Sequence, residues 1–215
     1  YFGTYERAYP RNDLIIKALR QANATVVECH TPVWEHERDK SRAYRGITAL
    51  KIVSRLLFSY IHLIIRYLRL PAHDVVIVGY IGQVDMFLAW VLTRLRAVPL
   101  VFNPLVSLYD TFCDDRDIVS PTSLTGRTFW LLDAIACHAA DIILLDTQQH
   151  VDYFVRTFSL PRGKFRIVPV GADDYLFKAQ PSQKDETERV KTCEVLFVGK
   201  LIPLHGIETI LRAAA

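Results

Sequence analysis

CEVLFVGKLIPLHGIETILRAAA, residues 193–215, is the stretch that indicates the fold most clearly. Val195–Val198 is a short apolar run of the kind that is buried in a parallel sheet. Gly199 and Lys200 interrupt this run, and after Gly206 apolar residues recur at every third or fourth position. The stretch therefore predicts a strand, a glycine turn and a helix, in that order.

A strand–turn–helix junction of this kind can bind a phosphate. Backbone N–H groups and the positive end of the helix dipole meet there. Lys200 and His205 add side-chain donors, so we predict that Gly199, Lys200, His205 and Gly206 form a phosphate-binding turn. The alternative is an ordinary turn whose glycines only allow close packing.

Strands and helices alternate along the rest of the chain. Apolar runs near residues 1, 24, 74, 99, 140 and 165 predict strands, and helical periodicity lies between them. This order predicts a doubly wound parallel α/β sheet over residues 1–177. Residues 178–192 are polar and predict a linker, and residues 193–215 would begin a second Rossmann-like domain.

The composition of the chain excludes some functions. It has 215 residues, a net charge of +3 and no dense basic patch, so we do not predict nucleic acid as a partner. The four cysteines, at positions 29, 113, 137 and 193, form no CxxC pair. We expect free thiols in a cytoplasmic protein, and no zinc site. Because the chain starts without Met and stops inside a predicted helix, we expect a fragment.

Several polar residues follow the predicted strands directly. Ligands of open α/β sheets gather at the carboxyl ends of the strands. The candidate cleft or acceptor residues are therefore Gly3, Thr4, Tyr80, Gly82, Gln83 and Asn103. Gly3 would allow a ligand to approach the backbone. Thr147 is well placed to cap a helix from residue 148.

Two further segments have unusual compositions. Residues 110–117, DTFCDDRD, are acidic but lack the glycine and glutamate of a calcium loop, so we predict a solvated loop without metal. A helix over 122–139 follows, with Phe129, Trp130, Leu132, Ile135 and Ala136 on its inner face.

Residues 46–70 combine an apolar centre with Lys51, Arg55, Arg66 and Arg69 at its flanks. The uninterrupted apolar run is too short to cross a bilayer. Two interpretations remain open: a packing helix of the domain, or a basic amphipathic helix in peripheral contact with an anionic membrane, at its inner face.

Two motifs carry a resemblance to a known family. Residues 168–173 (VPVGAD) and residues 199–211 (GKLIPLHGIETIL) resemble, in order, two signatures of the group 1, family 4-like retaining glycosyltransferases of the GT-B fold. The resemblance implies a hexosyltransferase-type enzyme that uses a nucleotide-sugar donor, without a metal or other cofactor. The acceptor would be a sugar, a lipid-linked molecule or a small molecule, in glycan, glycolipid or polysaccharide synthesis.

The resemblance also assigns roles to single residues, and it places Thr147 at the cleft, beside the donor site. Lys200 and His205 stand where the family commonly has the Arg and Lys that hold the diphosphate. The family's histidine after the strand near residue 99 is missing, which leaves Asn103 and Asp110 as candidate catalytic residues. We expect the fragment alone to be inactive. The alternatives are a non-catalytic nucleotide-binding or partner subunit and a sugar-nucleotide epimerase.

Overall fold

A computed structural model describes residues 1–33, 46–174, 176–178, 195–199 and 206–214, with only the backbone for residues 46–53. The strands are β1 (Phe2–Gly3), β2 (Cys29–His30), β3 (Val76–Val78), β4 (Leu100–Phe102), β5 (Ile142–Leu145) and β6 (Phe165–Ile167). The α-helices are α1 (Pro10–Gln21), α2 (Gly46–Leu68), α3 (Asp85–Arg96), α4 (Leu124–Ala139), α5 (Gln148–Phe158) and α6 (Ile207–Ala214). A π-helix, η2 (Asp110–Asp115), and a 3-10 turn, η3 (Arg162–Lys164), complete the described elements.

The strands form one parallel sheet in the order β2-β1-β3-β4-β5-β6. The chain first moves from β1 to β2 and then returns past β1 to β3, so the direction of winding reverses between β1 and β3. The predicted doubly wound α/β sheet is confirmed. The carboxyl ends of β1 and β3 flank the switch point, where α/β sheets commonly bind ligands.

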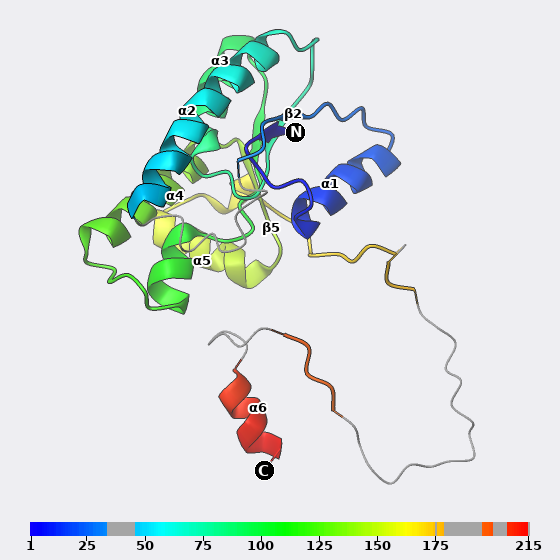
Figure 1. Cartoon of the computed structure of the whole chain (residues 1–215). Coiled ribbons are helices and arrows are strands. Elements are labelled where there is room, and N and C mark those ends of the chain that lie inside the picture. The colour runs from blue at the N-terminus through cyan, green and yellow to red at the C-terminus, as the bar shows by residue number, and fades with distance from the viewer. Residues whose placement is uncertain (34–45, 175, 179–194, 200–205, 215) are drawn as a thin grey trace.

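Four helices form a layer on one side of this sheet. α2 packs against α3, α3 against α4 and α4 against α5. Figure 1 shows α1 on the other side of the strands. The core between the sheet and the four-helix layer is apolar and includes Leu63, Met86, Phe102, Ile143 and Phe154, each at most 1% exposed. Burial of such side chains contributes about 2 kcal/mol each.

The second strand is shorter than predicted. β2 is confined to Cys29–His30, whereas the apolar run begins at residue 24. β1 contributes only Phe2 and Gly3 to the pairing, which leaves most of the run without a ladder. β-structure needs a hydrogen-bonded neighbour, so residues 24–28 do not form strand.

The C-terminal stretch is described only in part. Residues 195–199 have no sheet partner among the described strands, so the strand predicted at Val195–Val198 is not formed. The helix predicted after Gly206 is present as α6. Lys200 and His205 lie outside the described residues, as does Cys193.

The prediction of free thiols is confirmed for the three cysteines that the structure describes. Cys29, Cys113 and Cys137 are buried free thiols.

Candidate functional site at the carboxyl ends of the strands

A buried carboxyl group, that of Asp85, lies at the switch point between β1 and β3. Thr4, directly after β1, donates its backbone N–H to Asp85 Oδ2 at 2.6 Å, and Tyr60 of α2 donates its hydroxyl to Asp85 Oδ1 at 3.0 Å. Burial raises the pKa of Asp85 to about 6, although these hydrogen bonds oppose the shift. The acid thus ties β1, α2 and α3 together.

Gly3 is required by this arrangement. It has φ of +126°, and a Cβ added there would lie 2.5 Å from Asp85 Oδ2. The group that approaches the Gly3 backbone is therefore an internal carboxylate, where the sequence suggested a ligand. Gly82 is equally restricted, because an added Cβ would overlap the Gly79 carbonyl oxygen.

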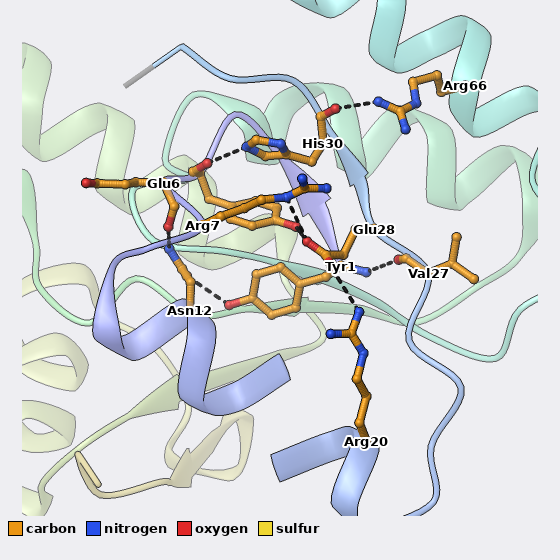
Figure 2. A network of polar contacts seen from close by, with 10 residues as sticks. Tyr1, Glu6, Arg7, Asn12, Arg20, Val27, Glu28, His30 and Arg66 are labelled. Atoms are coloured by element: carbon orange, nitrogen blue, oxygen red, sulfur yellow. Dashed lines mark hydrogen bonds and ion pairs between the residues drawn. The ribbon is translucent and has the colours of Figure 1, made fainter. Parts of the chain in front are cut away.

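A second network joins α1 to the ends of β3 and β4. The Tyr1 hydroxyl donates to Asn12 Oδ1 at 2.9 Å and accepts from Asn103 Nδ2 at 3.2 Å. Asn12 also accepts from the Tyr80 backbone N–H at 2.9 Å and donates to the Glu6 carbonyl at 2.9 Å. Figure 2 shows Asn12 between the Tyr1 hydroxyl and the Glu6 carbonyl. Asn103 is fully buried, so its amide is committed to holding the loops together.

Arg11 lies behind Asn103 and is only 3% exposed. Its Nε donates to Asn103 Oδ1 at 3.1 Å and its Nη1 donates to the Val168 carbonyl at 2.5 Å. Its Nη2 is buried without a hydrogen-bond partner. Burial lowers the pKa of the guanidinium, and the Asp146 carboxylate opposes that effect. Arg11 therefore connects the ends of β4, β5 and β6.

The Gln83 side chain points inward to a second buried acid. Gln83 is 1% exposed and donates to the Val106 carbonyl at 3.2 Å. Asp133 of α4 accepts from Ser107 Oγ and from the Tyr109 backbone N–H, both at 2.9 Å. Burial raises the pKa of Asp133 to about 6, while hydrogen bonds, including one from Gln83, oppose the shift. Together they fix the loop that follows β4.

Asp110 and Thr147 lie at the rim of this edge. The predicted acidic loop is wrong in part, because residues 110–115 form the π-helix η2. Asp110 is half-buried; burial raises its pKa, Asp114 adds to the shift, and His150 opposes it. Thr147 caps α5, with its hydroxyl accepting from the His150 backbone N–H at 3.2 Å. No group of residues in the described ranges has a composition and geometry suited to a metal ion.

The structure gathers most of the predicted residues at one edge of the sheet. Gly3, Thr4, Tyr80, Gly82, Gln83 and Asn103 surround the ends of β1, β3 and β4. Of the predicted phosphate turn, the structure describes only Gly199 and Gly206. Sequence reasoning did not single out Asp85 or Asp133, because an isolated acid inside a helical segment gives no signal of a buried partner that is distant in sequence.

A groove of about 560 Å³ lies beside this edge. Leu14, Ile15 and Ala18 of α1 form one wall, and residues 168–174 form the other. Lys17 bridges its rim through an ion pair with Asp173 at 2.7 Å. The first family-like motif, VPVGAD, thus runs along α1.

Comparisons with known proteins relate this chain to a family and to individual proteins. A family model described as "Glycosyl transferase 4-like domain" matches residues 14–171. A D-inositol 3-phosphate glycosyltransferase of Corynebacterium glutamicum is 26% identical over 144 residues, which cover 62% of this chain and 32% of that protein. Another protein of that name, from Acidothermus cellulolyticus, is 28% identical over 123 residues, covering 55% of this chain and 26% of the relative. The chain thus spans about a third or less of the curated relatives it matches.

Proposed function

Because this chain belongs to the glycosyl transferase 4-like domain family, we propose that it is the acceptor-side part of an enzyme that transfers a sugar from a nucleotide-sugar donor to an acceptor hydroxyl. The family match carries the proposal, since it covers the sheet from α1 to the segment after β6. We propose retention of the anomeric configuration and a role in glycan or glycolipid synthesis, on the resemblance of the two motifs.

The donor would be held mainly by residues beyond the sheet. Lys200 offers a fixed positive charge to the diphosphate, and the backbone N–H groups between Gly199 and Gly206 add further donors. Such preorganised charge can stabilise a diphosphate leaving group without a metal. We therefore expect transfer by the full-length protein to persist in a chelator, and the 215-residue chain alone to give no product.

Calorimetry of the full-length protein with UDP-glucose and GDP-mannose tests the donor site. Lys200→Ala should weaken binding of the preferred donor by about tenfold, the effect of losing one charge-assisted hydrogen bond. Lys178→Ala is the matched control, because that lysine lies at the start of the predicted linker. If neither nucleotide sugar binds the unaltered protein, the transferase proposal is wrong.

The first acceptor to test is D-inositol 3-phosphate, because the matched proteins from both organisms are named for it. Nuclear magnetic resonance of the product would give its anomeric configuration. Nucleotide-sugar binding without product would favour the non-catalytic subunit, and a changed sugar nucleotide without any acceptor would favour the epimerase.

We also propose that residues 46–70 contact an anionic membrane peripherally. The inner face of α2 carries Leu63 and Tyr67, at most 1% exposed, but its outer face is apolar as well. Phe58 is 70% exposed and Ile61 is 55% exposed, with Leu57, Ile65 and Leu68 beside them on the same outer face. An amphipathic helix in solution normally turns polar side chains outward, so this face favours an apolar partner.

The charges around α2 favour lipid over a second copy of the chain. Residues 46–70 contain Lys51, Arg55, Arg66 and Arg69 but no acidic residue. Two such faces would repel each other, whereas anionic headgroups would attract them. No helix in the described ranges is long and apolar enough to pass through a bilayer. The neighbouring α3, beside α2 in Figure 1, adds Trp90, which is 44% exposed.

Vesicle co-sedimentation tests this contact. The chain should bind vesicles that contain phosphatidylglycerol more strongly than vesicles of phosphatidylcholine alone, and Phe58→Ser with Ile61→Ser should abolish binding. Leu124→Ser is the control, because Leu124 is 83% exposed at the start of α4. Equal binding by the double variant, or concentration-dependent dimers that the variant abolishes, would contradict a lipid partner.

A further inference from the structure

A histidine–carboxylate pair lies at the end of β5. His150, in the first turn of α5, places Nδ1 2.5 Å from Asp146 Oδ1. Their side chains are 33% and 18% exposed. When Nδ1 donates its proton to a carboxylate, the other ring nitrogen, Nε2, is left as an acceptor. Within the described residues, His150 Nε2 has no hydrogen-bond partner.

Two more charged groups surround this pair, from separate segments. Asp110 of η2 is close enough for His150 to lower its pKa against the effect of burial. The Asp146 carboxylate also raises the pKa of Arg11 of α1 against the effect of burial. The Nη2 atom of Arg11 is buried and has no hydrogen-bond partner. The His150–Asp146 pair thus lies within electrostatic range of one charged group from η2 and one from α1.

The rim of this cluster suits a hydroxyl better than an anion. Asp110, Asp114 and Asp146 give it an acidic character, and Tyr153 already donates its hydroxyl to Asp114 at 2.8 Å. A phosphate would be repelled by these carboxylates. A sugar-like hydroxyl can donate to His150 Nε2 or to Asp110 and gains from both acceptors.

We propose that Asp146 and His150 form a subsite that binds a hydroxyl of a polyol substrate, with His150 Nε2 accepting the hydrogen bond. This subsite rests on the proposed function, since a sugar transferase must hold hydroxyl-rich molecules on its acceptor side. Asp146 is a positioning residue that fixes the imidazole tautomer. Arg11 supports Asp146 from the buried side of the sheet edge.

The first test reads the tautomer and the contact directly. Two-bond ¹H–¹⁵N spectra of the chain labelled at histidine, assigned with His150→Gln, should show His150 protonated at Nδ1. Addition of myo-inositol, or of methyl α-glucopyranoside, should shift the Nε2 signal of His150. A role only in capping α5 would give the same tautomer without this response.

Matched variants provide the second test. In Asp146→Asn the amide can donate to Nδ1, which would move the imidazole proton to Nε2 and remove the acceptor. We expect the Kd for myo-inositol to rise about tenfold in Asp146→Asn and in His150→Gln, the effect of one lost hydrogen bond. His62→Gln is the control, because His62 is exposed on α2 and, among the described residues, hydrogen-bonds to the Phe58 carbonyl of its own helix.

Some outcomes would overturn the subsite. An Nε2 signal that neither polyol moves would do so, as would wild-type Kd values in both folded variants, with folding checked by circular dichroism. Nucleotide-sugar binding by the full-length protein is measured separately. If the polyols do not shift the His150 signal but the full-length protein binds a nucleotide sugar, only the proposed subsite is wrong. If the full-length protein binds no nucleotide sugar, the proposed transferase function is wrong.

Discussion

The buried carboxyl group of Asp85 should make the protein less stable as the pH rises from about 4 to about 6. Asp85 is 1% exposed, and its pKa is raised to about 6 from an ordinary value of 3.8. In that window the unfolded chain loses the proton while the folded chain keeps it. The folded state therefore loses stability with increasing pH, and above pH about 6 no further change comes from this group.

The size of the effect follows from the two pKa values. A pKa difference of one corresponds to about 1.4 kcal/mol, so Asp85 accounts for about 3 kcal/mol across the window. Asp133 contributes a similar amount, because burial raises its pKa to about 6 as well. Asp85→Asn should remove about half of the pH dependence that comes from these two acids. The variant should also be the more stable protein at neutral pH, because Asn can still accept from the Thr4 N–H and donate to the Tyr60 hydroxyl.

Urea unfolding, followed by tryptophan fluorescence at a series of pH values, measures this difference. Asp117→Asn is the control, since Asp117 is exposed and its φ of +48° suits Asn. An Asp85→Asn variant with the same pH dependence as the unaltered protein would refute the reasoning. So would a variant that is less stable at neutral pH by several kcal/mol, because the ionised acid would then stabilise the fold.

Three further predictions concern stability and local order. Gly82→Ala should cost at least about 2 kcal/mol in urea unfolding, because its Cβ would overlap a backbone carbonyl, while Gly163→Ala, with open space around it, should change little. Ser123→Ala should cost about 1 kcal/mol, because Ser123 caps α4 by accepting from a backbone N–H, and an unchanged midpoint would contradict this. Arg11→Met should speed amide exchange at Val168 and Val170, because the hydrogen bonds that anchor this segment to α1 are removed; unchanged exchange would show that other contacts hold the segment.

The order of strands and helices could be predicted because each buried strand is a short apolar run. Short apolar runs such as 74–79 and 140–145, which lie between segments of helical periodicity, are typical of buried strands in a parallel sheet. Helix caps were also predictable: Thr147 is the N-cap residue of α5, as expected from its position directly before a helical pattern. These signals are local, so the sequence contains them.

The inner face of α4 was predicted correctly only in part, since Phe129 and Ala136 are buried as expected, at 6% and 1% exposed. Trp130 and Ile135 were expected inside, yet they are 39% and 41% exposed, while Asp133 is 1% exposed and points to the core. The reason is a partner distant in sequence: Asp133 accepts hydrogen bonds from Ser107 and from the Tyr109 backbone. Periodicity treats an aspartate as an outward residue, so it cannot anticipate an acid that folding pairs with a loop. Trp130 instead donates its indole N–H to the Thr157 carbonyl of α5.

The same long-range pairing changes the interpretation of the candidate cleft. Its position after β4 marked Asn103 as a candidate cleft residue, and the family resemblance left it as a candidate catalytic residue. Arg11 and Tyr1, however, already occupy its amide oxygen and nitrogen. A buried polar group that is fully hydrogen-bonded gains nothing from a ligand, and breaking its bonds would cost about 1–3 kcal/mol for each group left unpaired. Substrate contacts at this edge should therefore come from side chains with unused acceptors on the accessible rim. Among the described residues after β4 and β5, His150 meets that condition and Asn103 does not, although only Asn103 directly follows a strand.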